Sequence, residues 1–262
     1  MRGEVKELTR LLKNTQRMAV INGKPMPQVL GCVILCSGNV AKATSIVRDG
    51  ITSISQMSCD ILSDADEEII IPDIAKLLAV LKTHSGIVKL EQTDDKLRVS
   101  TSKKTTTLAA SKDALAFPHT TKSISEWSDE SIEKMAKITN DGYVLRDGRT
   151  HPYSVVLQIS PNDLVDAITS ANINGQKVSR YILEGNAEGF SMYVGDDMRG
   201  LVATLLDAIP CDDFATTVEG GLENLEYGEN LSLRVLDFTD LGQGKDIVLI
   251  SEGIRLYQRG IE

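Results

Sequence analysis

The feature that most constrains the fold is an order of elements that repeats in the two halves of the chain. Each half has a segment whose apolar residues recur at helical spacing, then short runs rich in β-branched residues, then a second short helical or helix-like segment and further runs. Turn signals such as SGN, RDG, TDDK and GNAEG separate the runs, as in antiparallel hairpins. Because the order repeats while the letters differ, we predict an α+β fold with antiparallel sheets and two similar domains.

The first helical segment, VKELTRLLKNTQRMAV, has a basic face. At about 100° per residue its cations fall within an arc of about 60°. They are Lys6, Arg10, Lys13 and Arg17, and the apolar residues opposite them are Val5, Leu8, Leu11 and Leu12. Glu4 and Glu7 flank this stripe, so we expect its charge to be largely uncompensated. Taken alone, the stripe also fits an ordinary solvated helix face, since long cations cover core edges well.

Composition limits the class of protein. The chain of 262 residues is long enough for two ordinary domains, and its 4% of aromatic residues leaves the core to Ile, Leu, Val and Ala. The formal net charge of −9 argues against general adhesion to nucleic acid but is compatible with one basic surface. No apolar run approaches the ~20 residues that span a bilayer, and charges interrupt the first apolar stretches. We therefore expect an intracellular protein.

Cysteines and short motifs give no sign of catalytic chemistry. Cys32 and Cys36 would point to one face of a strand, but neither a second such pair nor a nearby His accompanies them as metal ligands. Buried reduced thiols are the favoured interpretation for these residues and for Cys59 and Cys211. The sequence contains no GxxxxGK[ST], GxGxxG, HExxH or GxSxG motif, and we expect no cofactor.

Periodicity and turn signals place the elements. In the first half we expect three or four strands across Val29–Leu62, a helix from Pro72 to His84, and strands at Ile87–Gln92, Lys96–Ser100 and Lys104–Ser111. In the second we expect a helix capped by Ser160 and begun by Pro161, then strands at Val178–Glu184, Phe190–Val194, Gly200–Ile209, Leu231–Phe238, Lys245–Ser251 and Gly253–Arg259. A connector between them carries a short helix at Asp129–Ile138 with Ser128 as N-cap. The predicted domains are 1–111 and 153–262, joined by 112–152.

Four passages carry a resemblance to a known family. They are VKELTRLLKNT; IIIPDIAKLLAVLKT followed by GIVKLEQTDDKLRVSTS; LQISPNDLVDAITSA followed by YILEGNAEGFSMYVGDDMRG; and LENLEYGENLSLRVLDFTDLGQGKDIVLISEGIRLYQRG. In this order they resemble the helices, hairpins and closing strands of DNA sliding clamps, the processivity factors of replicative polymerases. The short acidic GGLENLEYG in place of a fourth helix and the helix in the connector depart from proliferating cell nuclear antigen and look closer to viral clamps.

The resemblance implies a DNA-clamp fold that assembles as a homotrimeric ring, with helices lining the hole and sheets outside. Such a ring encircles duplex DNA, contacts phosphates without reading bases, and is not an enzyme. Its implied partners are double-stranded DNA, a DNA polymerase and a clamp loader, with no membrane. The polar side of the third helix, with Asn162, Asp166 and Thr169, should contribute little charge.

The resemblance also implies three sets of site residues. The DNA-binding set is Lys6, Arg10, Lys13, Arg17, Lys76, Lys82, Lys177 and Arg180. The partner-peptide pocket is Val40, Leu115, Phe117, Ile254, Leu256 and Tyr257, each of which could equally be a core residue. The subunit interface, between strands Lys104–Ser111 and Gly200–Ile209, contains Thr106, Leu108, Leu201, Val202 and Leu205.

Two other functions stay open at this point. A relative with the clamp fold could serve as an adaptor in transcription or repair. An α+β enzyme could hold a metal ion at an acidic turn such as VGDD, with Asp196 and Asp197 as oxygen ligands. Aspartate is also common in such turns for backbone reasons, which weakens the enzyme hypothesis.

Overall fold

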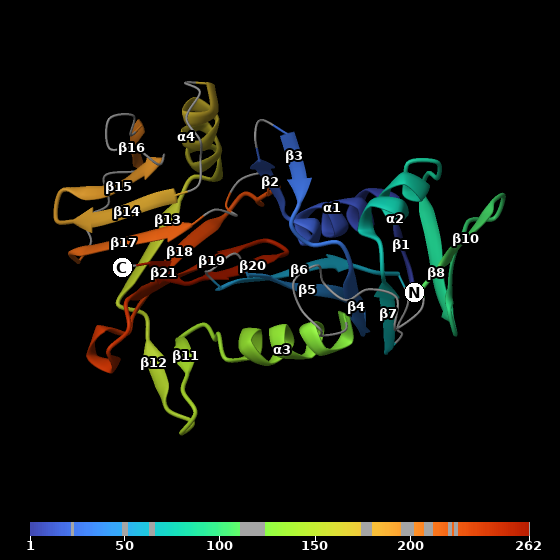
Figure 1. Cartoon of the computed structure of the whole chain (residues 1–262), viewed down its shortest axis with the longest axis horizontal. Helices are drawn as coiled ribbons and strands as arrows, with labels where there is room; N and C mark the ends of the chain where they lie inside the picture. The colour runs from blue at the N-terminus through green and yellow to red at the C-terminus, as the bar shows by residue number, and fades with distance from the viewer. Residues whose placement is uncertain are drawn as a thin grey trace. The chain divides into compact units, whose positions relative to one another are not determined.

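The computed structural model (Figure 1) describes residues 1–21, 24–48, 52–62, 66–110, 124–173, 180–194, 202–206, 212–219, 222 and 225–261. The chain forms two compact units. The first consists of Met1–Met18, Pro27–Ile46 and Ser55–Lys134, and the second of Ala19–Met26, Val47–Ile54 and Met135–Glu262. Both combine helices with antiparallel sheets, which confirms the predicted α+β class. The domain bounds drawn from the sequence stay a prediction.

The first unit contains two antiparallel sheets. One has the order β1-β8-β9-β10, formed by Arg2–Glu4, Ile87–Thr93, Lys96–Ser100 and Thr105–Ala109. The other has the order β7-β4-β5-β6, formed by Glu67–Ile71, Cys32–Ser37, Val40–Arg48 and Thr52–Asp60. The chain also forms a two-stranded ribbon of β2 (Met18–Ile21) and β3 (Lys24–Pro27), where the sequence indicated only a turn.

Helices α1 (Val5–Gln16) and α2 (Ile74–Leu81) pack against each other. Their buried apolar residues are Leu8, Leu11 and Leu12 on α1 and Ile74, Leu77 and Leu81 on α2, as the periodicity predicted. Asp73 is the N-cap of α2, and its Oδ1 accepts a hydrogen bond from Lys76 N over 2.9 Å. The prediction that Pro72 is the first helical residue is therefore wrong, because the Asp73 side chain satisfies the first turn and places the helix start after itself.

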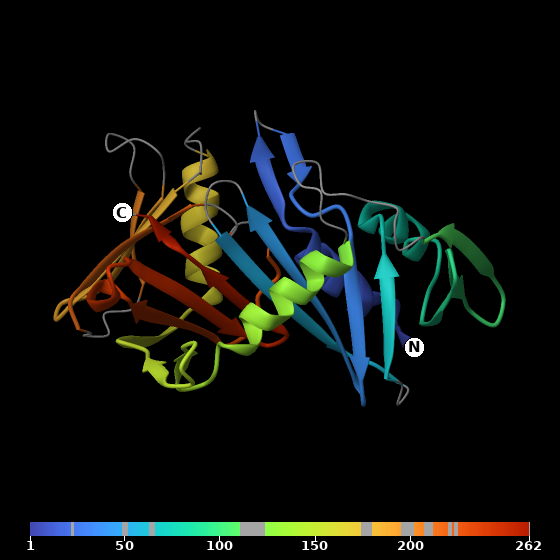
Figure 2. The ribbon, with the colours of Figure 1, turned by 60° about the horizontal axis from the view of Figure 1, so that its bottom comes forward.

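Helix α3 (Ile124–Ala136) lies against the β7-β4-β5 face of the first unit. Ile124 packs with Val33 and Ile70, and Trp127 is also buried. Figure 2 shows the helix in front of these strands. The prediction that Ser128 caps the helix is wrong, since Ser128 lies inside it and is buried. The helix starts earlier because Ile124 and Trp127 then remove apolar surface from water.

The second unit also has two antiparallel sheets. One has the order β13-β18-β19-β20, formed by Val155–Ile159, Leu231–Asp237, Lys245–Ser251 and Ile254–Gln258. The other has the order β16-β15-β14-β17-β21, formed by Val202–Leu206, Gly189–Val194, Arg180–Asn186, Phe214–Glu219 and Gly260–Ile261. Strands β17 and β21 were not predicted. A hairpin of β11 (Gly142–Val144) and β12 (Thr150–Pro152) and a 3-10 turn at Thr239–Leu241 complete the unit.

Helix α4 (Pro161–Ile173) begins as the sequence predicted, with Ser160 Oγ accepting a hydrogen bond from Asp163 N over 3.3 Å. Its buried residues Leu164, Ala167 and Ile168 face the unit's interior, and the helix packs against β15 and β16. Between β17 and β18 the described residues, 222 and 225–230, contain no helix. Among the helices described, none has the length and apolar character needed to cross a membrane.

Candidate DNA-facing helices and subunit edges

The basic face of α1 is partly neutralised. Lys6 and Lys13 are exposed. Arg10 is 29% exposed and forms an ion pair with Glu7 over 3.0 Å, one helical turn away. The expectation of an uncompensated stripe therefore fails at Arg10, because a residue three positions before it lies close enough on the helix surface to pair.

Arg17 does not belong to this exposed face. The helix ends at Gln16, and Arg17 has a positive φ of 51° and is 2% exposed. Its carbonyl accepts a hydrogen bond from Gln28 N over 2.8 Å, where the chain returns beside the helix end. The predicted fourth cation of the stripe is thus directed into the protein by the turn that follows α1, and we leave it out of the candidate DNA surface.

Helix α2 presents two cations with different surroundings. Lys76 is 74% exposed and pairs with Asp73 over 3.1 Å, the same carboxylate that caps the helix. Lys82, at the C-cap, is exposed. A cation at a helix C-terminus interacts favourably with the helix dipole, so Lys82 suits its position whether or not it binds a ligand.

The second unit offers little positive charge on its helix. Over residues 161–169, the part of α4 whose side chains are described, the exposed residues are Asn162, Val165, Asp166 and Thr169. Arg180, at the start of β14, is exposed, whereas Lys177 lies outside the described residues. Of the two cations predicted for this unit, the structure therefore describes only Arg180, which lies on a strand and not on a helix.

Strands β10 and β16 each end a sheet. On β10, Thr106 and Leu108 pair with Val99 and Leu97, which are buried. Cross-strand partners share a face, so Thr106 and Leu108 lie on the core side of the edge, where both are half-buried.

On β16, Val202 pairs with Val194 and Leu205 with Ser191, whereas Leu201 lies outside the described residues. The two strands predicted to form a subunit interface are thus both sheet edges. An edge exposes backbone N–H and C=O groups that can pair with another strand.

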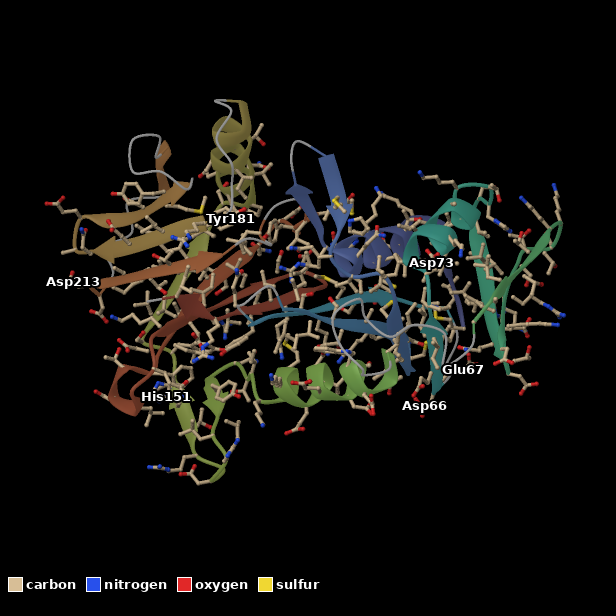
Figure 3. All side chains as sticks on the ribbon, viewed as in Figure 1. Asp66, Glu67, Asp73, His151, Tyr181 and Asp213 are labelled. Atoms are coloured by element: carbon tan, nitrogen blue, oxygen red, sulfur yellow. The ribbon has the colours of Figure 1, made fainter. Side chains whose placement is uncertain are left out.

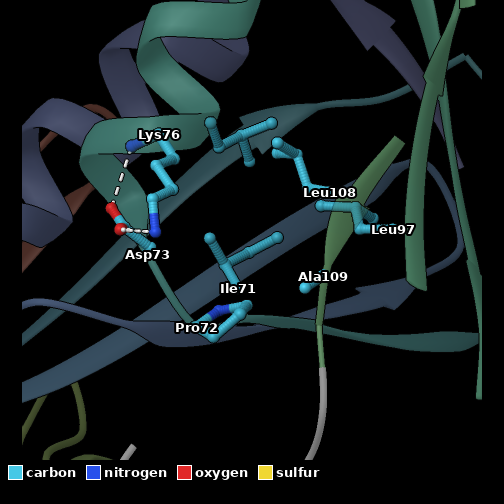
Figure 4. A pocket seen from close by; sticks show the side chains of 8 residues that line it. Ile71, Pro72, Asp73, Lys76, Leu97, Leu108 and Ala109 are labelled. Carbon is cyan, nitrogen blue, oxygen red and sulfur yellow. Dashed lines mark hydrogen bonds and ion pairs between the residues drawn. The ribbon is translucent and has the colours of Figure 1, made fainter. Parts of the chain in front are cut away.

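A cavity of about 250 Å³ lies beside β10 (Figure 4). Its apolar lining comes from the end of β7, helix α2 and strands β9 and β10, and consists of Ile71, Pro72, Leu77, Leu97, Leu108 and Ala109. The Asp73–Lys76 ion pair completes the lining. Among the described strands, only β9 pairs with β10, so this edge of the first unit combines backbone groups without a strand partner there with an apolar hollow.

The predicted peptide pocket is only partly compatible with the structure. Ile254 and Leu256 are 3% and 0% exposed, so they are core residues of the second unit and we remove them from the pocket. Val40 and Tyr257 are half-buried, and Leu115 and Phe117 lie outside the described residues. The prediction failed at Ile254 and Leu256 because alternate residues of β20 face the core of its sheet.

An aromatic cluster that the sequence did not predict surrounds the β11–β12 hairpin. Tyr143 meets Phe238 edge-on at 5.7 Å between ring centroids and stacks with Tyr257 at 6.3 Å. His151 stacks on Phe238 at 4.6 Å, and its Nε2 lies 2.7 Å from the carbonyl oxygen of Asp237. The cluster joins the hairpin to the sheet that contains Tyr257 and so limits access to that residue.

Three cysteines are buried free thiols, as predicted: Cys32, Cys36 and Cys59. Burial raises the pKa of Cys32 to about 12, so its thiolate is disfavoured at neutral pH. Cys211 lies outside the described residues. Within the part of the chain that the structure describes, no three His, Cys, Asp or Glu side chains gather as a metal site would require.

Comparisons with known proteins identify the fold. No family model matches the chain, and no curated protein matches it in sequence. Among solved structures, a DNA polymerase sliding clamp from Pseudomonas aeruginosa is similar over 100% of this chain and 64% of its own, with a TM-score of 0.60 and 14% identity.

The polymerase III beta proteins of Caulobacter crescentus and Thermotoga maritima are also similar over 100% of this chain, and over 66% and 65% of their own. Their TM-scores are 0.62 and 0.63, at 15% and 11% identity. The chain thus spans just under two thirds of the length of these bacterial proteins. The matches do not support the viral or nuclear-antigen type suggested by the sequence, but they establish that this chain has the sliding-clamp fold.

Proposed function

We propose that this chain is a sliding clamp that closes into a ring around duplex DNA and holds a replicative DNA polymerase there. The observation that carries the proposal is that β10 in the first unit and β16 in the second are edge strands among the described strands of a chain with the clamp fold. If β10 of one copy pairs with β16 of the next, the contact is head-to-tail, and such a contact either closes into a ring or grows a filament. In this proposal the chain acts by topology and is not an enzyme.

The two compact units of the chain are the basis for proposing a homotrimer. The chain spans 64–66% of the bacterial clamps compared above. Related clamps close as dimers of three-domain subunits, and three copies of a two-domain chain supply the same number of domains. The sequence resemblance implied the same homotrimer. We keep the homotrimer as a proposal, without the nuclear-antigen-like or viral type.

Charge supports the pairing of unlike edges. Residues 96–111, which contain β10, include four basic residues and no acidic one. Residues 180–219, which contain β14 to β17, include eight acidic and two basic residues. Figure 3 labels one of these, Asp213, which is exposed just before β17. Complementary charge of this kind speeds encounter and disfavours pairing of like edges.

The cavity beside β10 adds an apolar component to the proposed interface. A strand paired to β10 would carry its core-side residues past Leu108, toward the hollow lined by Leu97 and Leu77. The candidate interface residues are Thr106, Leu108, Leu201, Val202 and Leu205. Apolar contacts there would withstand salt, which screens exposed charges.

The proposed DNA contacts are sequence-independent. We retain Lys6, Arg10, Lys13, Lys76 and Lys82, with Lys177 and Arg180 as weaker candidates. Cations aimed at phosphates hold DNA without stalling at particular bases. For the peptide of a polymerase or clamp loader we retain Val40, Leu115, Phe117 and Tyr257.

Two measurements on the full chain test the proposal. Sedimentation at micromolar concentration should show a species of three 28.5 kDa chains. On circular plasmid DNA the protein should co-elute with the circle and be lost when the plasmid is cut once, because a closed ring slides off an end. A protein that stays equally on circular and linear DNA would disprove the topological mechanism.

A matched pair of variants tests the edge. Thr106→Lys places a charge on the half-buried side of β10, whereas Ile87→Lys changes a 52% exposed residue on β8, an inner strand of the same sheet. Thr106→Lys should shift the protein to monomer with its circular dichroism unchanged, since lysine on an edge blocks strand addition. Dissociation by Ile87→Lys alone would rule out β10 as the interface.

A further inference from the structure

Helices α1, α2 and α4 are the described helices that the proposed clamp would turn toward DNA, and they differ in charge. Helix α1 carries three basic residues and one acidic residue within its bounds. Helix α2 carries one basic residue, with one acidic and one basic residue at its two caps. Helix α4 carries two acidic residues, Asp163 and Asp166, and no basic one.

The cations of the first unit are not equally available. Within the described residues, Lys6 and Lys82 are exposed and form no ion pair. Arg10 and Lys76 are held by Glu7 and Asp73 at 3.0 and 3.1 Å. A phosphate would meet Lys6 and Lys82 directly, whereas it would have to displace a carboxylate from the other two.

The outward face of α4 has the opposite chemistry. Asp166 is exposed, and Val165 is 43% exposed; Thr169, which is also exposed, lies three and four positions after them and so neighbours both on the helix surface. Neither a carboxylate nor an aliphatic side chain attracts a phosphate. At physiological ionic strength charges act over about 8 Å, so the residues nearest to DNA decide the local force.

We infer that duplex DNA contacts α1 and α2 of the first unit and is repelled by α4 of the second. The inference rests on the proposed clamp function, and it replaces an evenly basic wall by one whose charge alternates around the ring. The duplex is then retained by the closed ring and by a few cations in each copy. The DNA-binding surface is centred on Lys6 and Lys82, with Lys13, Arg10 and Lys76 as supporting cations.

Two threonines provide a matched test. Thr9 lies on α1 beside Lys6 and Lys13 in the helical projection, and Thr169 lies on the exposed face of α4. Each is replaced by cysteine in a Cys211→Ser background and labelled with a short photoactivated crosslinker. Because Cys32, Cys36 and Cys59 are buried, labelling is directed to the introduced thiol.

Rings loaded on circular DNA are then irradiated. The Thr9→Cys protein should crosslink to DNA on the order of fivefold more than the Thr169→Cys protein, because a like-charged surface lowers the local density of phosphate. Adding Asp163→Lys and Asp166→Lys to Thr169→Cys should raise its yield toward that of Thr9→Cys. Equal yields from Thr9→Cys and Thr169→Cys, or no response to the lysines, would overturn the inference.

A salt titration gives a second readout. Lys6→Gln with Lys82→Gln should make equilibrium binding to short linear duplex DNA less salt-dependent, with the log–log slope reduced by about 0.9 for each phosphate that is no longer neutralised. Asp163→Asn with Asp166→Asn should leave the slope nearly unchanged, and an equal response to both pairs would contradict the inference. If no protein is retained on circular DNA at all, the proposed clamp function fails instead, and that outcome is visible before any crosslink is counted.

Discussion

The hydroxyl of Tyr257 on β20 donates a hydrogen bond to the buried carboxylate of Asp246 on β19. The other carboxylate oxygen accepts a hydrogen bond from Gly260 N over 3.0 Å. Gly260 begins β21, which pairs with β17 in the second sheet of the same unit. A Cβ at Gly260 would lie 2.0 Å from the carbonyl oxygen of Lys245, so this close approach requires glycine. One buried carboxylate thus ties together the two sheets of the second unit.

Removing the Tyr257 hydroxyl should destabilise the second unit. Tyr257→Phe leaves Asp246 buried with one hydrogen-bond donor fewer, and the free energy of unfolding should fall by about 1–3 kcal/mol. Urea unfolding followed by far-UV circular dichroism measures this. The control is Tyr193→Phe on β15, a half-buried tyrosine whose change should cost less than about 0.5 kcal/mol. Similar losses in the two variants would show that the Asp246 contact contributes little.

Asp246 should make stability depend on pH. Burial raises its pKa above the ordinary 3.8, although the bonds from Tyr257 and Gly260 act in the opposite direction. The Asp246 carboxyl group therefore binds its proton more tightly in the folded chain than in the unfolded chain. Its contribution to stability is largest below 3.8 and is lost as the pH rises through the raised value. The unfolding free energy of the native protein minus that of Asp246→Asn should thus increase as the pH falls toward 3.8, and a difference that stays flat would contradict the shift.

The buried cysteines should resist alkylation in the folded protein. Desolvation raises the pKa of Cys32 and of Cys59 to about 12, and it also raises the pKa of Cys36. Reaction requires an accessible thiolate, so a Cys211→Ser protein treated with iodoacetamide at about pH 7.5 should gain no label until denaturant is added. Mass spectrometry counts the labels. Labelling of any of the three thiols without denaturant would mean that the sheet around it opens readily.

Freeing Arg10 should strengthen the interaction with DNA. Glu7→Gln removes the carboxylate that pairs with Arg10, and a released guanidinium is available for one more phosphate. The log–log salt slope of equilibrium binding to short linear duplex DNA should steepen by about 0.9, while stability changes by less than about 1 kcal/mol. Glu188→Gln, an exposed change in the turn between β14 and β15, is the matched control for net charge. An equal effect of both variants would assign the change to net charge alone.

Periodicity within a segment was enough to predict much of the fold. The apolar faces of α1 and α2, the start of α4 at Ser160–Pro161 and the hairpin strands at Lys96–Ser100 and Lys245–Ser251 all follow from residues close in sequence. Such signals are local, because a helix buries residues three and four apart and a strand alternates them. They also placed both predicted interface strands, which the structure shows to be sheet edges.

Tertiary packing decided the rest. Whether Arg17 points to solvent depended on how the chain turned after Gln16, and whether Ser128 capped α3 depended on the burial of Ile124 and Trp127 against another element. Strand β17 forms by pairing with β14, which lies more than twenty residues earlier. Leu256 is a core residue because alternate residues of β20 are buried. The sequence by itself determined where the helices lie and where most of the hairpin strands lie. Only the folded chain decided which side chains lose water, because burial is set by neighbours that are distant in sequence.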